Sequence, residues 1–467
     1  MVDFNITTEL LQIIKSEQAY QYRIIPVEKN ALRLKLKTDN RNGSDFENEI
    51  SILLGIDISI EIDSTDNINR YLSTNYRKST SESISEIHYS NDFLEKILVS
   101  AKGMGSSDIH FEQYESLARV RFRLDGKLKE QFHIDMEEYP VIINKIKIRA
   151  QLDISEKRLP QDGRITVNTD YEDFDIRVSV LPTLFGEKAV LRILSRDTGA
   201  VDITTLGFTD QELSIYKENI RKPNGLVLIS GPTGSGKTTT LYATLKNLNN
   251  SSSNILTIED PIEYTLEGIN QVQLKENIGM DFATTLRTFL RQDPDIIMVG
   301  EIRDASTANM AIRAALTGHL VLSTIHTNSS LATISRLIDM GVPPFLIAST
   351  LNISVAQRLV RKLCASCKTI APISEEILPK GFELPDDLTD HHIANGCAEC
   401  HHTGYRGRKA IYEILPIDKE LSWLIKNGAP DIESYIDEKN IYTLKKNAIS
   451  LIKEGTTSVD EVFSLLM

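Results

Sequence analysis

The feature that most constrains the fold is a glycine-rich run placed directly after a short apolar stretch. Residues 226–230 read LVLIS, and residues 231–240 continue as GPTGSGKTTT. The run fits GxxxxGK[ST] without mismatch, in the strand-to-helix context where that motif binds phosphate. Its glycines let successive backbone N–H groups turn inward on a phosphate, and the following helix N-terminus adds a favourable field. The sequence therefore predicts a strand, a phosphate loop and a helix.

Each residue type in this loop suits a nucleoside triphosphate. Lys237 supplies a positive charge for the β- and γ-phosphate oxygens, and the Thr238 hydroxyl is expected to ligate magnesium. A chance match by a glycine-rich turn is the alternative, and the flanking strand and helix disfavour it. We predict ATP binding by Gly231, Pro232, Thr233, Gly234, Ser235, Gly236, Lys237, Thr238 and Thr239.

Three further apolar runs follow the loop at intervals filled by helical segments. They are ILTI at residues 255–258, IIMV at 296–299 and LVLSTI at 320–325. Such alternation indicates a parallel sheet with helices on its faces. In these sheets ligands bind at the carboxyl ends of the strands, so the residues just after each run are the candidates for chemistry.

Acidic residues follow the run ILTI, in the segment EDPIE. Glu259, Asp260 and Glu263 lie within five residues of one another. They could hold magnesium directly or through water, or they could only cap a turn, since Asp before Pro commonly starts one. Their position beside a phosphate loop favours the functional interpretation.

The run IIMV is followed by Gly300-Glu301, and the run LVLSTI is followed by His326. Glu301 stands one residue later than the aspartate that usually ends this strand in phosphate-loop ATPases. Because EDPIE supplies acids for the metal, we assign Glu301 to the attacking water. A lone histidine is more often a satisfied polar side chain, but His319 and His326 flank one strand. The order of loop, acids, acid and histidine predicts a RecA-like nucleoside triphosphatase core.

The residues before this core show other patterns. Residues 1–75 mix a helical patch, TELLQIIKSEQAY, with a strand-like one, ALRLKLKT, and a polar Ser/Thr-rich stretch follows. Residues 91–200 begin as a helix and continue as alternating hairpins, one turning at Asp125-Gly126, which predicts an α+β domain with an antiparallel sheet. Arg164 and Arg177 fall on predicted strands of this domain. They are either solvent-facing charges or fingers that reach a γ-phosphate, which the arginine fork matches well.

All four cysteines form two CxxC pairs, Cys364/Cys367 and Cys397/Cys400, separated by 29 residues (397 − 367 − 1). In a cytoplasmic chain such pairs favour metal over disulfides. Two thiolate pairs suit a closed, tetrahedral, structural zinc site. Four reduced thiols without metal are the alternative.

Composition limits the remaining possibilities. The chain has 467 residues and a formal net charge of −13. It shows neither an apolar run of roughly 18 residues nor a signal-peptide pattern, so we expect it in the cytoplasm. The acidic balance speaks against nucleic acid as a partner. A nucleic-acid translocase and an ATP-binding scaffold without turnover stay as alternatives.

From about Ser107 onward the chain resembles the secretion ATPases of type II secretion and type IV pilus assembly. The blocks that carry the resemblance appear in order: SDIHFE, RLPQDGRI, GPTGSGKTTTLYA, TIEDPIEY, LRQDPDIIMVGEIRD and LTGHLVLSTIHTN. CASC and CAECHHTGYRGRKAIYEIL resemble the zinc module of that family. This module points to the assembly or secretion branch rather than to the retraction branch.

The resemblance implies a homo-hexameric ring and a division of the chain into domains. These are an N-terminal α/β docking domain at 1–75, a linker at 76–90, an α+β PAS-like domain at 91–200 and an α/β RecA-like ATPase domain at 201–467. The last includes a zinc module at 361–405 and a C-terminal helical part at 406–467.

The resemblance also implies residue roles and partners. Glu301 becomes the catalytic glutamate, Glu259 and Glu263 contribute to the magnesium and water site, and His326 belongs to a histidine box. Arg164 and Arg177 become phosphate sensors. Members of the family drive pilin or pseudopilin assembly through a polytopic inner-membrane platform protein, so we expect this chain at the cytoplasmic face of that membrane. A membrane protein is expected to dock on residues 1–75.

Overall fold

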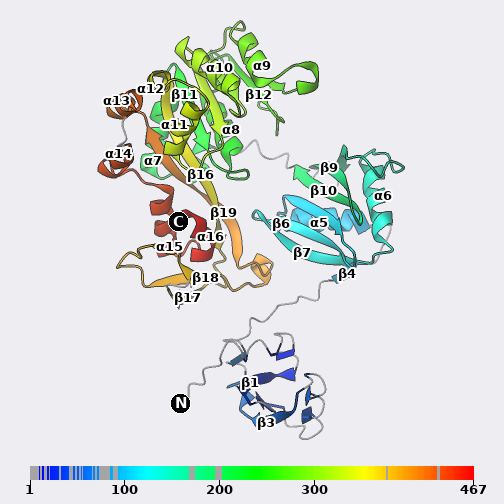
Figure 1. Ribbon diagram of the computed structural model, residues 1–467. Helices are drawn as coiled ribbons and strands as arrows, with labels where there is room; N and C mark the ends of the chain where they lie inside the picture. Colours follow the sequence, from blue (N-terminus) through cyan, green and yellow to red (C-terminus); the bar gives the residue numbers. More distant parts are fainter. Residues whose placement is uncertain are drawn as a thin grey trace. The chain divides into compact units, whose positions relative to one another are not determined.

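The computed structural model divides into two compact units, Met1–Ser85 and Glu86–Met467 (Figure 1). The structure describes residues 93–167, 174–194, 202–374, 377–428 and 432–467, together with 85–87 and scattered parts of 10–72. None of the described helices is long and apolar enough to cross a membrane.

The first unit contains a small mixed sheet. β1 (Ile24–Lys29) pairs antiparallel with β2 (Leu34–Thr38), and β2 pairs parallel with β3 (Ile58–Ile62). β2 alternates buried and partly exposed residues, as the strand-like sequence ALRLKLKT predicts. The helical prediction for residues 8–20 falls largely outside the described residues, as does most of the predicted linker, where only β4 (Ser85–Ile87) is described.

The described part of the larger unit begins with a seven-stranded sheet of order β4-β7-β6-β5-β10-β9-β8. Its strands after β4 are β5 (Asp108–Gln113), β6 (Ala118–Leu124), β7 (Lys127–Ile134), β8 (Gln161–Val167), β9 (Phe174–Thr183) and β10 (Gly186–Leu194). The turn between β6 and β7 is Asp125-Gly126, which confirms the predicted hairpin.

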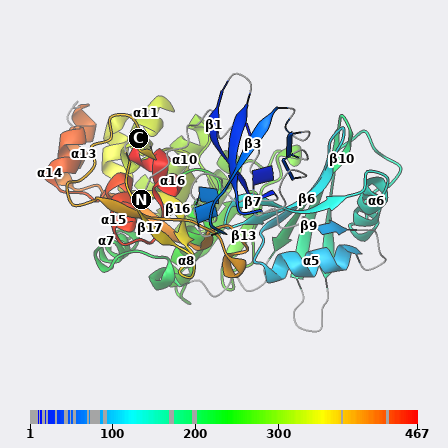
Figure 2. The ribbon, with the colours of Figure 1, turned by 90° about the horizontal axis from the view of Figure 1, so that it is seen from below.

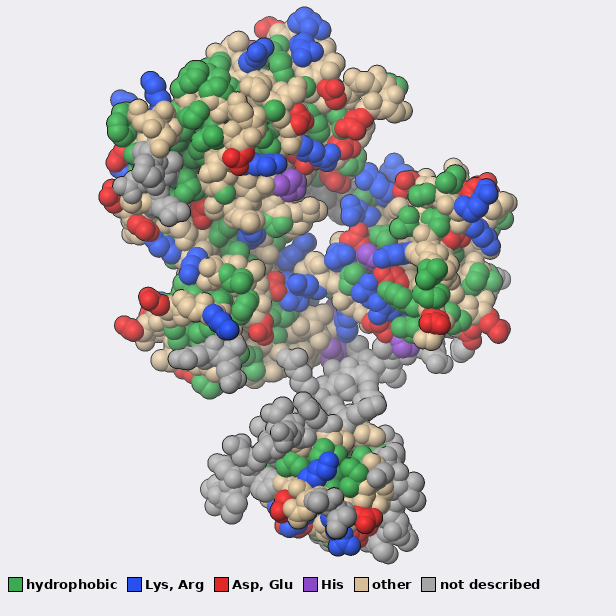
Figure 3. Space-filling view, viewed as in Figure 1, with side chains coloured by type: hydrophobic (Ala, Val, Ile, Leu, Met, Phe, Trp, Pro, Cys, Tyr) green, Lys and Arg blue, Asp and Glu red, His purple; other side chains and the backbone are tan. Residues whose placement is uncertain are grey.

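Strand alternation gives this sheet one apolar and one charged face. Residues such as Phe111, Phe122 and Val178 form a buried core with α5 (Phe93–Gly103) and α6 (Tyr139–Arg149), which Figure 2 shows beside the sheet. The opposite face carries acidic side chains that form ion pairs with neighbouring cations. Glu112, for example, contacts Arg119, Arg121 and Lys188. On the face drawn in Figure 3, cationic and acidic side chains are interspersed rather than segregated by sign.

The second seven-stranded sheet of the described residues has the order β13-β12-β14-β15-β11-β16-β19. All of its strand pairs are parallel except β16–β19, which is antiparallel. The strands are β11 (Gly225–Ser230), β12 (Ile255–Glu259), β13 (Asn270–Gln273), β14 (Ile296–Val299), β15 (Leu320–Ile325), β16 (Leu351–Leu363) and β19 (Tyr405–Pro416). The four predicted apolar runs thus become β11, β12, β14 and β15.

Helices cover both faces of this sheet, because its strands are apolar on both sides. Val227 and Ile229 of β11 pack with α7 (Asp210–Ile220) and α8 (Lys237–Leu248). Leu226 and Leu228 belong to the core on the other face. That core includes α9 (Phe282–Phe289), α10 (Ala305–Leu316), α11 (Ser330–Asp339), α12 (Pro344–Thr350), α13 (Lys419–Asn427) and α14 (Ile432–Glu438). The predicted α/β architecture is confirmed.

The antiparallel pair β16–β19 joins the sheet to the C-terminal region. α15 (Leu444–Lys453) and α16 (Val459–Leu466) pack against Val360 of β16 and Ile411 of β19, beside which Figure 1 shows them. The chain between β16 and β19 contains a two-stranded sheet, β17 (Thr369–Pro372) and β18 (Asp390–Ile393). The cysteines lie just after β16 and just before β19.

Candidate functional site

The phosphate loop connects β11 to α8, as its sequence predicts. Gly231, Gly234 and Gly236 have φ angles of +149°, +81° and +89°, which side chains other than glycine rarely adopt. At two of these positions there is also no room for a side chain. A Cβ on Gly231 would lie 2.5 Å from the Gln357 carbonyl oxygen, and one on Gly236 would lie 2.8 Å from the Gln357 side-chain nitrogen.

Gln357 therefore supports the loop from the neighbouring strand β16. Its side chain is buried, and its Oε1 accepts a 2.9 Å hydrogen bond from the Thr240 hydroxyl on α8. The sequence patterns gave no signal for this residue, because its role depends on β16 lying beside β11.

Lys237 is buried at the start of α8. Its Nζ donates to the carbonyl oxygens of Gly231 at 2.9 Å and Pro232 at 3.1 Å. Burial lowers the pKa of Lys237, the nearby Glu301 charge raises it, and the Arg358 charge lowers it further. The side chain therefore lies in the electrostatic field of both a carboxylate and a second cation.

The remaining loop groups fit a bound phosphate and magnesium. The Ser235 hydroxyl is buried and has no hydrogen-bond partner among the described residues, so it is available to an oxygen-rich ligand. Thr238 and Thr239 are exposed at the first turn of α8, where hydroxyl and amide groups reach a ligand. These donors match what a triphosphate with its metal requires.

Glu301 lies just after β14, with its side chain 15% exposed. It contacts the Arg303 guanidinium, and its Oε2 lies 3.1 Å from Nε2 of His326. The structure therefore brings Glu301 and His326 together from two adjacent strand ends. His319, in contrast, lies between α10 and β15, with its Nδ1 2.9 Å from the Ala314 carbonyl oxygen.

The strand ends carrying the acids are held close together. Gly300 donates its N–H to the Ile258 carbonyl at 2.8 Å, and its own carbonyl accepts from the Thr324 hydroxyl at 2.8 Å. A Cβ on Gly300 would lie 3.4 Å from the Glu259 Cα. Glycine here lets the backbone before Glu301 pass tightly beside Glu259.

Glu259 is only 3% exposed, and both of its oxygens accept hydrogen bonds. The Tyr242 hydroxyl of α8 donates to Oε2, while Thr257 and Gln271 donate to Oε1 at 2.6 and 3.1 Å. The pKa of Tyr242 is raised by burial and then by Glu259, so the hydroxyl remains a donor. Glu259 is thus a buried carboxylate that fixes the EDPIE segment to α8.

The other two acids of this segment are more accessible. Asp260 has a side chain 40% exposed and lies 3.8 Å from Arg303. Glu263 is exposed, and its backbone N–H donates to the Tyr242 hydroxyl at 3.3 Å. These carboxylates remain open to water and ions, unlike that of Glu259.

Arg164 on β8 and Arg177 on β9 lie on the charged face of the sheet formed by β4 to β10. They are direct cross-strand partners, and Arg177 is also the partner of Arg192 on β10. Arg164 pairs with Asp175 at 2.7 Å while its side chain stays 66% exposed. No hydrogen bond or ion pair joins Arg164 or Arg177 to the phosphate loop among the described residues. Arg192 extends the row, and only strand pairing reveals it.

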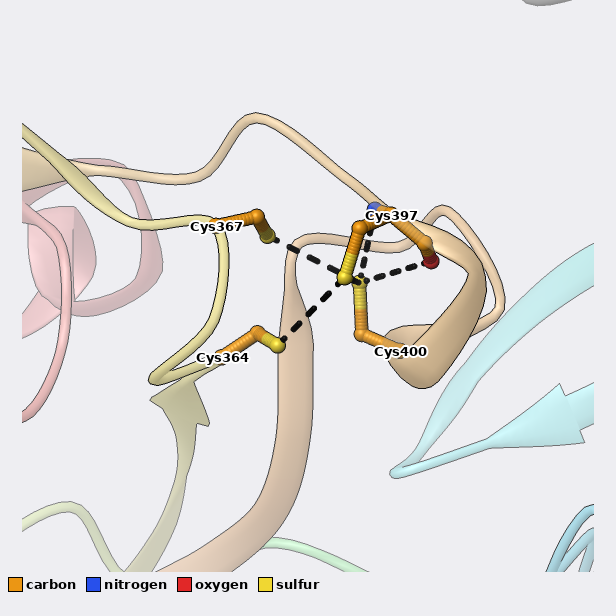
Figure 4. A group of neighbouring side chains, drawn as sticks. All are labelled: Cys364, Cys367, Cys397 and Cys400. Carbon is orange, nitrogen blue, oxygen red and sulfur yellow. Dashed lines mark hydrogen bonds between the residues drawn. The ribbon is translucent and has the colours of Figure 1, made fainter.

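The four cysteine thiols converge, with all of their Sγ atoms within 4.8 Å of one another (Figure 4). The Sγ–Sγ distances are 3.8 Å for Cys364–Cys397, 3.9 Å for Cys367–Cys400 and 3.8 Å for Cys397–Cys400. A tetrahedron with Zn–S bonds of about 2.3 Å has edges of about 3.8 Å. The thiols therefore already have the spacing of a four-sulfur zinc site.

The backbone around the thiols also suits a metal thiolate. The N–H groups of Cys397 and Gly404 point at the Cys400 Sγ, at 3.1 and 3.2 Å. Burial opposes ionisation of this thiol, but hydrogen bonds from these amides, together with those from the Cys397 and Cys367 thiols, outweigh burial and lower the pKa of Cys400 to about 7. Such N–H···S bonds stabilise the charged form that binds zinc.

Comparison with known proteins gives a consistent assignment. The family model described as "Type II/IV secretion system protein" matches residues 85–464. The chain is 40% identical over 492 residues to "Type IV pilus assembly ATPase PilB" of Myxococcus xanthus (strain DK1622), covering 98% of this chain and 87% of the relative. It is 43% identical over 360 residues to "Type II secretion system ATPase E" of Vibrio cholerae serotype O1, covering 77% and 71%.

Solved structures show the same fold. The Legionella pneumophila ATPase DotB superimposes with a TM-score of 0.61 at 22% identity, covering 82% of this chain and 97% of that one. The pilus retraction motor PilT, solved with bound ADP, gives 0.53 at 26% identity, covering 79% and 95%. The chain therefore belongs to the family of type II/IV secretion system proteins, and it is an ATPase motor of the kind that drives type II secretion or type IV pilus assembly.

Proposed function

We propose that this chain is the subunit of a homo-hexameric ring at the cytoplasmic face of the inner membrane, where ATP hydrolysis drives pilin or pseudopilin assembly. Two of its relatives are named as ATPases of type IV pilus assembly and of type II secretion, which supports a role in fibre assembly. The observation that carries the proposal is the position of Glu301 at the end of β14, in contact with His326 and Arg303, at the same edge of the sheet as the phosphate loop that follows β11.

ATP is held by the loop residues 231–239. Backbone N–H groups of the loop and the α8 N-terminus bind the β-phosphate, while Lys237 leaves its carbonyl partners for the β- and γ-oxygens. Thr238, with Asp260 or Glu263 acting directly or through water, holds magnesium, and both acids are accessible enough to do so. Magnesium, when bound, neutralises charge on the phosphates.

Glu301 acts on the attacking water. It orients the water in line with the γ-phosphorus and accepts its proton as the new P–O bond forms and the bond to the β-phosphate oxygen breaks. His326 and Arg303 contact this carboxylate on either side and fix its direction. Glu259 positions the neighbouring EDPIE segment through its buried hydrogen bonds, and its own oxygens are already occupied.

Residues 91–200 serve as the PAS-like domain of the motor. Arg164 and Arg177 approach the γ-phosphate only when this domain closes on the ATPase domain, 201–467. Hydrolysis removes the γ-phosphate that these arginines contact, so the two domains open again. The chemical step is thereby coupled to the rotation of one domain against the other. The exposed Arg164 side chain, held by a single aspartate, is free to exchange partners in this way.

The four cysteines hold a structural zinc ion that fixes the module at residues 361–405. Four thiolates close the coordination sphere, so this ion takes no part in hydrolysis. The module lies between the end of β16 and the start of β19, two paired strands of the nucleotide sheet.

Residues 1–75 dock on a membrane protein, and the ring passes its rotation to a polytopic platform protein of the inner membrane. The formal net charge of −13 agrees with a protein partner rather than nucleic acid. The fibre served is a pilus, a secretion pseudopilus or a DNA-uptake filament.

Phosphate release and particle mass test the proposal together. The purified chain should hydrolyse ATP only with magnesium, in particles of six times the 52.5 kDa chain mass. Lys237→Ala should abolish release while leaving the fold intact. Rings that bind ATP tightly and release no phosphate would support a scaffold instead, and stimulation by nucleic acid would support a translocase.

A further inference from the structure

We propose that Arg358, on β16, is a phosphate-binding residue that each subunit supplies to its own nucleotide site. The inference rests on the proposed use of the phosphate loop by ATP. It adds a cation that lies outside the glycine-rich motif, the acids and the arginine pair of the first sheet.

Arg358 lies directly beside the phosphate loop. Its Nη1 would be 3.1 Å from a Cβ placed on Gly231, the first glycine of the loop. Its positive charge also acts on Lys237. Two cations thus flank the same loop, one at its end and one from the neighbouring strand.

The guanidinium has only neutral partners in the described structure. Nη1 donates to the Gln357 carbonyl at 3.0 Å, and Nη2 donates to the Asn328 carbonyl at 2.8 Å. Among the described residues, no carboxylate lies within ion-pair distance of Arg358. Burial accordingly lowers the pKa of Arg358, and only the more distant Glu413 opposes this effect.

Glu413 is already occupied. This buried carboxylate accepts the backbone N–H and hydroxyl of Ser330, at 2.8 and 2.6 Å, and the backbone N–H of Leu444 at 3.1 Å. It holds the first residues of α11 and α15. It is therefore committed to two helix N-termini, and Arg358 keeps an uncompensated charge.

Arg361, three residues further along the same strand, shows the ordinary arrangement. Its guanidinium donates to Glu461 at 2.9 and 2.6 Å and lies over the Tyr405 ring. An arginine built only for stability is paired in this way. Arg358 differs because a half-buried cation without an acid, next to a second cation, is costly unless an anion binds between them.

A phosphate satisfies this requirement. The guanidinium offers five N–H donors in a planar fork that matches phosphate oxygens, and two carbonyls use only part of that capacity. Because Nη2 also holds the Asn328 carbonyl, two residues after His326, a phosphate bound by Arg358 restrains the loop that carries this histidine.

The test compares Arg358→Gln, Arg358→Lys and Arg361→Gln in the full chain, by equilibrium binding of Mg-ATP and of AMP and by melting without nucleotide. Arg358→Gln should weaken ATP binding by about tenfold to a hundredfold, the range for losing a charged hydrogen bond. AMP binding and the melting temperature should not fall. Arg358→Lys should regain part of the ATP affinity. Arg361→Gln should lower the melting temperature and leave ATP affinity unchanged.

The opposite pattern would overturn the inference. If Arg358→Gln has a lower melting temperature and the ATP affinity of the wild type, Arg358 only stabilises the fold by joining β16 to the loop at Asn328. Lys237→Ala separates the two proposals. If it abolishes ATP binding while Arg358→Gln does not weaken it, only the inference about Arg358 fails. If Lys237→Ala leaves ATP binding intact, the proposed nucleotide site itself is wrong.

Discussion

Replacing Tyr242 by Phe should loosen the EDPIE segment from the phosphate-loop helix. The Tyr242 hydroxyl donates to the buried Glu259 carboxylate and accepts the Glu263 backbone N–H. Phenylalanine keeps the ring and its edge contact with Tyr264 but removes both hydrogen bonds. Among the described residues, the buried carboxylate then keeps only Thr257 and Gln271 as donors.

The expected cost follows from the charge of the acceptor. A hydrogen bond to a charged group contributes about 1.5–3 kcal/mol. At about 2–4 °C per kcal/mol for a domain of this size class, the ATPase transition should melt roughly 3–12 °C earlier. ATP turnover should fall as well, because Asp260 and Glu263 lose a fixed position relative to α8.

Tyr264→Phe is the matched control, since Tyr264 lies against the same ring and its hydroxyl has no hydrogen bond among the described residues. Melting of the two variants by scanning fluorimetry, and their phosphate release at saturating ATP, give the comparison. The reasoning about Glu259 is refuted if Tyr242→Phe melts and turns over like Tyr264→Phe.

Three further predictions concern other parts of the chain. Replacing Cys397 by Ser should reduce bound zinc, measured by metal analysis, from one per chain and should lower thermal stability more than ATP affinity; a zinc-free wild type would contradict the site. Burial raises the pKa of Glu112, but hydrogen bonds from Arg121 and Lys188 outweigh burial and lower it to about 2. This depressed pKa contributes stability that is present above pH 4.5 and is lost as pH falls from there toward 2, so Glu112→Gln should flatten this part of the stability profile, and an unchanged profile would count against it. Gly231→Ala should abolish ATP binding without unfolding the chain, because a Cβ would lie 2.5 Å from a backbone oxygen, and retention of wild-type affinity would show that the loop yields.

Local patterns explain why much of the fold was predictable. The apolar runs that become β11, β12, β14 and β15 are short, continuous and separated by helices, and Asp125-Gly126 marks its hairpin by turn chemistry alone. The phosphate loop likewise needs only its own residues to be recognised. Two CxxC pairs predict their convergence because thiol spacing is part of the motif.

The supporting residues were not predictable, because their roles depend on non-local neighbours. Gln357 and Arg358 follow the loop by more than 110 positions and reach it only because β16 lies beside β11. Tyr242 appears as one apolar position of a helix until it is seen to meet Glu259. Arg192 joins Arg177 only through the register of β9 and β10. Sequence periodicity carries no information about which strands become adjacent.

The most direct test of the mechanism is a single-turnover measurement on Glu301→Gln. The variant keeps a side chain of the same size beside His326 but cannot accept a proton from water. We predict that it binds Mg-ATP as tightly as the wild type, while the rate of phosphate formation falls by orders of magnitude. Hydrolysis at a near-wild-type rate by this variant would contradict the assignment of Glu301 to the attacking water.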